Sequence, residues 1–325
     1  MKTTEKSNRT WLVAAWPGMG QVGSIAAGYL VHALGAKPVA ELPARGFFDI
    51  EQVEIKGGVV VPPHLPRNVL HRWKAPGENG PELLIFLAEA QPSIESHEFA
   101  HELLDQAQKL GAERVMSFAS VASQLHPSQA PKAFGVVTQP DMKPDIEKAG
   151  ASMLQDGQIG GLNGVLLGAA AERGLPGVCL LGEIPYFAGA VANPKAARAV
   201  LGAFSKMTGV PVDTTELTKH DEVVDKVLLD LLERLKQQAE QTGAQINLPE
   251  EPDEFESSEE ESDEMPEPQV VETKPDYATR ERIEKLFDSA RKDRSRAVRL
   301  KTELDRLGLF PQYEDRFLDL FKRAA

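Results

Sequence analysis

The sequence predicts an α/β domain with layered architecture, followed by a helical C-terminal segment. Short apolar runs alternate with helical patterns through the first half of the chain, an order typical of α/β sheets. The chain has 325 residues, 42% of them hydrophobic, and can therefore bury a sizeable core. A sharp change of composition near Pro249 ends this domain, which we place at residues 1–248.

In the first half of the chain, strand and helix patterns follow one another. Buried strands are predicted at residues 11–16, 38–42, 83–87, 114–118 and 134–138. A helix rich in Ala and Gly is predicted at 22–34. A second helix is predicted at 96–110, where Phe99, Leu103 and Ala107 share one face. The Pro-punctuated stretch 50–70 is predicted to form a hairpin with loops.

The second half of the core domain is predicted to be mostly helical. Helices are expected at 162–173, at 194–208, where Pro194 suits a first turn, and at 221–241. One more buried strand, 177–181, lies between the first two of these helices.

The C-terminal part divides into an acidic linker, residues 249–275, and a helical segment, residues 276–325. The stretch Glu250–Glu267 holds eleven Asp or Glu and no Lys or Arg, so we expect it to be disordered. The helical segment carries Ile283, Leu286 and Phe287 at helical spacing. It would either bind a partner as a tethered module or fold back on the protein's own oligomer, and we favour the second.

Cysteine content and hydropathy indicate a cytoplasmic protein. Cys179 is the only cysteine, so no intramolecular disulfide can form, which fits a reducing compartment. No window approaches the length of a membrane span, and the polar N-terminus lacks a signal-peptide pattern. No basic stripe marks the N-terminal domain. We therefore expect neither a membrane nor a nucleic-acid partner.

The most informative local string is a glycine loop after the first predicted strand. Gly18, Gly20 and Gly23 spell G-x-G-x-x-G between that strand and a helix, and Glu41 follows 18 residues after Gly23. This pattern fits a dinucleotide site, in which backbone amides hold a pyrophosphate. It fits equally a tight turn with close helix–sheet packing. Together with Met19, these glycines are candidate ligand-binding residues.

Polar residues near the predicted strand ends could line the same site. Ser117, Ser120 and Ser123 lie at and beyond one strand, while Glu89 and Glu183 follow two others. Ligands of α/β sheets gather at the carboxyl ends of strands, and two acids there would suit general acid–base work. No G-x-S-x-G elbow surrounds the serines, so capping of loops explains them equally well.

A second motif, H-E-x-x-H, lies on the helix predicted at 96–110. Its residues His97, Glu98 and His101 could hold zinc with Glu98 as general base, as in metallopeptidases. A third ligand would be needed, for which His126 or Glu113 could be proposed. Because the two histidines lie opposite the apolar face, we interpret the motif as a chance match and expect no metal or other cofactor.

Two separated blocks resemble the proteasome assembly chaperone two family. The first is WPGMGQVG at 16–23 followed by AAGYL at 26–30. The second is made of GGLNGVLLG at 160–168, ERG at 172–174, CLLGEIP at 179–185 and NPKAARAVL at 193–201. Their order and spacing are family-like over residues 10–240.

The resemblance implies a three-layer α/β/α sandwich similar to the nucleoside phosphorylase and hydrolase folds, with no established cofactor at the glycine loop. It implies a non-catalytic assembly-chaperone-like or protein-interaction role, and we expect a homo-oligomer. The alternative is an enzyme or sensor that binds a nucleoside- or nucleotide-like ligand at Gly18–Gly23. Relatives that dock on proteasome rings end in hydrophobic–Tyr–any residue, whereas this chain ends in Ala324 and Ala325, which argues against such docking.

Overall fold

The computed structural model describes residues 10–50, 53–77 and 80–242, together with Pro249 and residues 283, 286, 287, 300, 313 and 316. The chain divides into two compact units, Met1–Phe255 and Glu256–Ala325. Each unit is described by itself.

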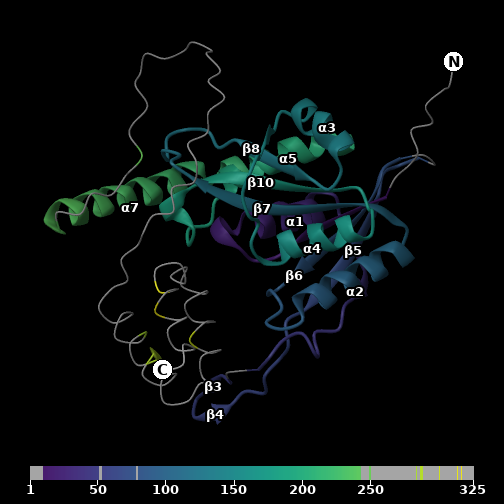
Figure 1. Cartoon of the computed structure of the whole chain (residues 1–325), viewed down its shortest axis with the longest axis horizontal. Coiled ribbons are helices and arrows are strands. Elements are labelled where there is room, and N and C mark those ends of the chain that lie inside the picture. Colours follow the sequence, from purple (N-terminus) through teal and green to yellow (C-terminus); the bar gives the residue numbers. More distant parts are fainter. Residues whose placement is uncertain are drawn as a thin grey trace, which may run out of the picture. The chain divides into compact units, whose positions relative to one another are not determined.

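The first unit is built on an eight-stranded mixed sheet (Figure 1). The strand order is β2-β5-β6-β1-β7-β10-β8-β9, and the central strands β6, β1, β7 and β10 are parallel. The strands β5, β8 and β9 run against them. The bounds are β1 Thr10–Ala15, β2 Lys37–Glu41, β5 Asn68–Lys74, β6 Glu82–Ala88, β7 Ala112–Ser123, β8 Ala133–Val137, β9 Ser152–Met153 and β10 Gly177–Pro185.

Helices cover both faces of the sheet, which confirms the three-layer α/β/α fold (Figure 1). One face packs against α1 (Val22–Ala33), α3 (Lys143–Lys148) and α5 (Pro194–Thr208). The other packs against α2 (Ser96–Lys109) and α4 (Gly161–Glu172). The short α6 (Thr215–Thr218) and the long α7 (Asp221–Thr242) follow α5.

Strand β1 shows how the sequence produces two cores. Side chains of a strand point alternately to opposite faces. Accordingly Trp11 and Val13 join the core under α1 and α5, whereas Leu12 and Ala14 join the core under α2 and α4. All six residues of β1 are buried, which is why this segment reads as an uninterrupted apolar run.

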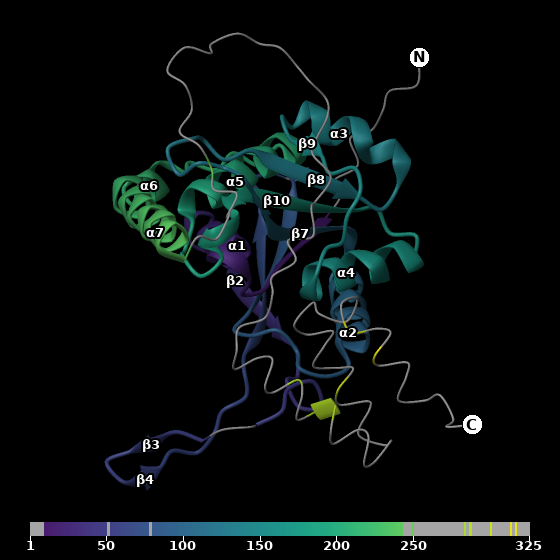
Figure 2. The same ribbon diagram turned by 60° about the vertical axis from the view of Figure 1, so that its left-hand side comes forward.

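A two-stranded arm projects from the sheet between β2 and β5 (Figure 2). Its strands β3 (Ile55–Lys56) and β4 (Val59–Val60) form a hairpin around Gly57 and Gly58. Both glycines have positive φ, 57° and 81°, as a two-residue hairpin turn of this kind requires. The hairpin predicted within 50–70 is therefore present, and its last part belongs to β5.

The described residues of the second unit are helical, at positions expected to be helical. Ile283, Phe287 and Leu300 are buried, and the Phe287 ring lies 5.8 Å from that of Tyr313. Apart from Pro249, the predicted linker 249–275 lies outside the described residues. Its disorder and the proposed domain boundaries stay predictions.

Two predicted strand ends were wrong, because β7 and β10 continue well past their apolar runs. Strand β7 extends to Ser123, so the three candidate serines lie within the strand. Strand β10 extends to Pro185 and includes Glu183. Strand β1 pairs with β7 only as far as Ser117, whereas β10 pairs with β7 from Val115 to Ser123. The mutual pairing of β7 and β10 therefore extends both strands and overrides the weak strand signal of the small polar residues.

Candidate functional site

The glycine loop lies where the carboxyl end of β1 enters α1, and its backbone groups are bonded within the protein. We call Gly18–Gly23 the glycine bend. The amide of Gly20 donates to the Gly189 carbonyl at 2.7 Å, and the amide of Gln21 donates to the Gly18 carbonyl at 3.0 Å. The Gly20 carbonyl accepts from the Asn193 amide at 2.8 Å. At least two amides that a phosphate site could use are therefore occupied.

Two of the bend's glycines have local reasons that involve no ligand. Gly20 has φ of 62°, a conformation that glycine adopts without steric cost. Gly23 lies in the first turn of α1, where an added Cβ would stand 2.4 Å from the Phe118 carbonyl oxygen of β7. The positive φ explains the glycine at position 20, and the close approach of α1 to β7 explains the glycine at position 23. Ligand binding at Gly18, Met19, Gly20 and Gly23 stays a prediction.

The candidate serines of β7 point to three different partners. The Ser120 hydroxyl donates to the Met19 carbonyl at 2.9 Å and so holds the glycine bend against β7. Ser117 is fully buried, and its hydroxyl lies 3.4 Å from the Asn163 carbonyl of α4. It also bonds Cys179, whose thiol pKa burial raises to about 12 despite that hydrogen bond. Ser117 and Cys179 therefore bond within the core, where burial disfavours the reactive thiolate of Cys179.

Glu183 of β10 and Ser123 of β7 are hydrogen-bonded to each other at the ends of these neighbouring strands. One carboxylate oxygen of Glu183 accepts from the Ser123 hydroxyl at 2.8 Å, and the other accepts from the Lys132 amide at 3.0 Å. The Glu183 side chain thereby anchors the loop before β8.

Glu89 also accepts a hydrogen bond from a backbone amide, but it lies at a different strand from Glu183. Its carboxylate accepts from the Arg67 amide at 2.9 Å, next to β5. Strands β1 and β7 separate the two acids, so three strand spacings, about 14 Å, lie between their strands. The structure therefore does not pair them for general acid–base work.

Sequence reasoning missed two residues that fix the surroundings of the bend, Gln91 by its side chain and Asn193 by its backbone amide and its side-chain cap. The Gln91 amide donates to the Pro17 carbonyl at 2.8 Å, and its oxygen accepts from the Leu162 amide at 3.1 Å. Asn193 caps α5 through its side-chain oxygen at 3.0 Å from the Ala196 amide. Asn before Pro at a helix start was the available signal for Asn193; Gln91 had none.

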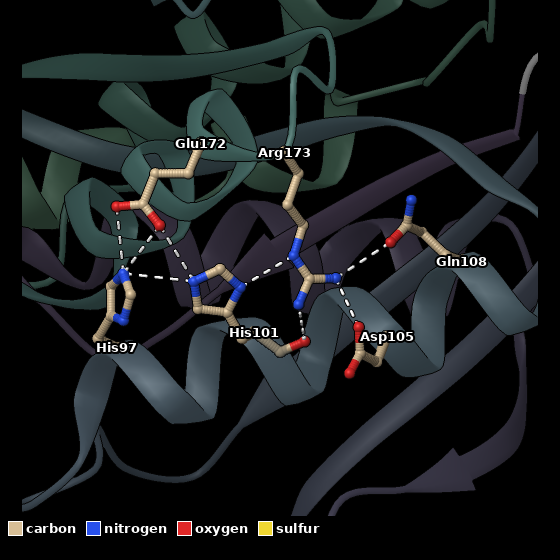
Figure 3. Close-up of polar contacts among 6 residues, drawn as sticks. All are labelled: His97, His101, Asp105, Gln108, Glu172 and Arg173. Carbon is tan, nitrogen blue, oxygen red and sulfur yellow. Dashed lines mark hydrogen bonds and ion pairs between the residues drawn. The ribbon is translucent and has the colours of Figure 1, made fainter.

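The histidine motif forms a polar cluster with a residue from another helix (Figure 3). His97 and His101 lie one turn apart on α2, and their Nε2 atoms are 3.3 Å apart. Glu172 at the end of α4 places Oε2 at 3.1 Å from His97 Nε2 and 3.2 Å from His101 Nε2. We call these three residues the imidazole cluster. The third member is Glu172, not His126 or Glu113.

Arg173, the residue after Glu172, holds the other side of His101 (Figure 3). Its Nε–H donates to His101 Nδ1 at 2.9 Å, and a terminal nitrogen donates to the His101 carbonyl at 3.0 Å. The remaining terminal nitrogen binds Asp105 at 2.6 Å and Gln108 at 3.1 Å. The stripe of α2 that the sequence assigned to solvent therefore faces the end of α4.

The electrostatics of the cluster favour an ionised carboxylate. Hydrogen bonding from His97 holds the pKa of Glu172 below its ordinary value, and the bond from His101 and the charges of both rings act in the same direction. Partial desolvation opposes this shift. Such an arrangement presents one anionic and two imidazole ligand atoms at a single point.

Two surface hollows are lined by none of the residues Gly18–Gly23. One, of about 370 Å³, lies between β8 and α4 and is lined by Val136, Thr138, Leu154 and Leu167 among others. The other, of about 590 Å³, lies at the base of the arm and includes Phe48, Pro63 and Gln91. In the described part of the chain, no helix combines the length and apolarity that crossing a membrane needs.

The fold is that of an α/β/α sandwich. The polar side chains near the strand ends are hydrogen-bonded to backbone and side-chain groups of the same sandwich. The chain matches the PAC2 family over residues 12–232. It therefore belongs to the PAC2 family. This is the proteasome assembly chaperone family that the two sequence blocks resemble.

Similar proteins come from archaea and bacteria. An uncharacterized protein of Methanocaldococcus jannaschii, MJ1210, is 26% identical over 257 residues, which is 78% of this chain and 94% of that protein. PbaB of Pyrococcus furiosus, described as an archaeal proteasome activator, is 28% identical with a TM-score of 0.58, over 70% of this chain and 94% of its own.

Two further structures share the fold. PbaA of Pyrococcus furiosus, described as an archaeal homolog of proteasome-assembly chaperone, is 26% identical with a TM-score of 0.52. The match covers 73% of this chain and 96% of PbaA. A PAC2 family protein of Streptomyces avermitilis is 24% identical with a TM-score of 0.58, over 68% and 95% of the two chains, and shows the fold alone.

Proposed function

We propose that this chain is a non-catalytic interaction protein of assembly-chaperone type that works as a homo-oligomer through the β3–β4 arm. We define the arm as residue 50 together with residues 53–61. The observation that carries the proposal is the arm's exposed apolar surface. Ile55, Val59 and Val60 are 65%, 68% and 57% exposed, and Ile50 and Val53 are also more than half exposed.

An arm of this kind is poorly suited to stand alone in water. A single two-stranded hairpin without a third strand is marginally stable at best. Its strands form a separate sheet that pairs with no other strand in the described residues. Contiguous exposed Val and Ile mark interaction surfaces in soluble proteins. A partner surface would bury these side chains and complete the hydrogen bonding of the strand edges.

A second copy of the same arm is the partner that its chemistry suits best. Glu54 and Lys56 flank the apolar residues with opposite charges, and they lie 3.2 Å apart within the arm. A two-fold pairing of arms would set apolar residues against apolar residues, and acid against base. The relatives PbaB and PbaA, described as a proteasome activator and as a homolog of a proteasome-assembly chaperone, support a role in protein assembly. We include a role in protein assembly for this chain in the proposal.

The test is the mass of the full-length chain by size-exclusion chromatography with light scattering, at several concentrations. We expect an oligomer, and we expect Val59→Asp with Val60→Asp to weaken it by about 2 kcal/mol or more. The matched control is Val223→Asp on α7, which is 64% exposed but lies outside the arm. A native chain that stays monomeric, or a double variant with unchanged mass, would contradict the proposal.

A further inference from the structure

We propose that the imidazole cluster binds a divalent transition-metal ion of the zinc type, which links α2 to α4. The residues that would ligate it are His97 and His101 through Nε2 and Glu172 through its carboxylate. The argument uses neither the arm nor the family, so it stands or falls apart from the proposed function.

The spacing of the three ligand atoms matches that of a tetrahedral zinc site. Bonds of about 2.0–2.1 Å in tetrahedral geometry separate the ligand atoms by about 3.3 Å. The three separations in the cluster are 3.3 Å between the two Nε2 atoms, and 3.1 and 3.2 Å from these to Glu172 Oε2. The ion could therefore enter with only small shifts of the side chains.

The ligand types and their setting also fit. Two imidazoles with one carboxylate form a known set for zinc, and three protein ligands leave a fourth position for water. The side chains of His97, His101 and Glu172 are 51%, 28% and 58% exposed, so an ion can reach them from solvent. Two helices contribute ligands, and each is fixed by its packing in the core under α2 and α4.

The hydrogen bond from Arg173 to His101 determines which ring nitrogen of His101 carries a proton, and this affects zinc binding. The Arg173 Nε–H donates to His101 Nδ1, so in the neutral ring the proton sits on Nε2, the atom that would bind the metal. A ligating histidine normally carries its proton on the other nitrogen and donates it to an acceptor. Zinc would displace the Nε2 proton, Nδ1 would take up a proton, and Arg173 would have to turn from it.

Metal and Arg173 therefore compete for His101. The guanidinium would still keep its bonds to Asp105, Gln108 and the His101 carbonyl, so the change is local. Replacing Arg173 by Met removes the competing donor while keeping a long apolar stem. We expect zinc to bind Arg173→Met about tenfold more tightly, in the range that changes beside metal ligands produce.

The experiment is titration of the full-length, metal-free protein with zinc chloride, followed by calorimetry and by thermal unfolding, with magnesium chloride as the comparison ion. We expect zinc to bind and to raise the unfolding temperature, and magnesium, which prefers oxygen ligands, to do neither. His97→Ala, His101→Ala and Glu172→Gln should each lose the effect. Circular dichroism confirms that each variant is folded.

Two matched variants keep the test specific. Glu98→Gln removes an exposed carboxylate from the same motif but outside the cluster, and zinc binding should persist. Lys109→Met removes a positive charge from α2 without touching His101, and it should not reproduce the gain of Arg173→Met. Absence of zinc binding by the native protein, or binding that survives in Glu172→Gln and His97→Ala, would overturn the proposal.

Discussion

The glycine bend and the imidazole cluster both begin as short motifs associated with ligands, yet their polar atoms are used differently. In the bend, carbonyls and amides already bond to Gly189, Asn193 and Ser120, and Gln91 holds the Pro17 carbonyl just before it. In the cluster, three ligand-type atoms converge on one point at the surface. A motif is therefore best judged by which of its polar atoms the rest of the fold already occupies.

The sharpest way to break the packing interpretation is to add one methyl group at Gly23. Gly23→Ala would place a Cβ 2.4 Å from the Phe118 carbonyl oxygen, which is backbone and cannot move aside cheaply. We expect the free energy of unfolding to fall by about 3 kcal/mol, at the upper end of overpacking costs. Chemical denaturation measures this loss.

Gly28→Ala is the control for that substitution. Gly28 lies on the same helix, and an added Cβ there meets nothing within 4 Å. Alanine should stabilise the helix by about 0.5–1 kcal/mol. Equal tolerance of both substitutions would show that the bend does not pack as described.

A smaller effect is expected where a side chain fastens the bend. Gln91→Ala removes the bonds to the Pro17 carbonyl and the Leu162 amide. We expect a loss of about 1–2 kcal/mol in thermal unfolding, because both backbone groups lose a partner in a part-buried setting. The exposed Gln241, changed in the same way, should have no measurable effect. A neutral Gln91→Ala would mean that the bend holds its shape without this bridge.

The smallest effect is expected in the imidazole cluster without metal. Arg173→Met breaks the contacts with His101, Asp105 and Gln108, but Asp105 and Gln108 are exposed. Surface ion pairs contribute about 0–1 kcal/mol, so stability in a chelating buffer should hardly change. A fall of several kcal/mol in the free energy of unfolding would show that Arg173 mainly stabilises the packing of α4 on α2.

Sequence patterns predicted the parts of the fold that are set locally. The apolar run before Gly18 and the 3.6-residue spacing of Phe99, Leu103 and Ala107 sufficed to place β1 and α2. The ends of β7 and β10 could not be predicted, because strand pairing across the sheet extends them through small and polar residues. The same holds for the site: Glu172 joins His97 and His101 only through the packing of α4 on α2.

The account's central claim is that the glycine bend is a packing joint and that the protein works through its surfaces. The most direct test is thermal unfolding of the full-length chain with nucleosides, nucleotides, dinucleotides and inorganic phosphate. We predict no change in unfolding temperature with any of them. A rise that is lost in Gly18→Val, where the backbone is extended and an added Cβ meets nothing within 4 Å, would contradict the claim.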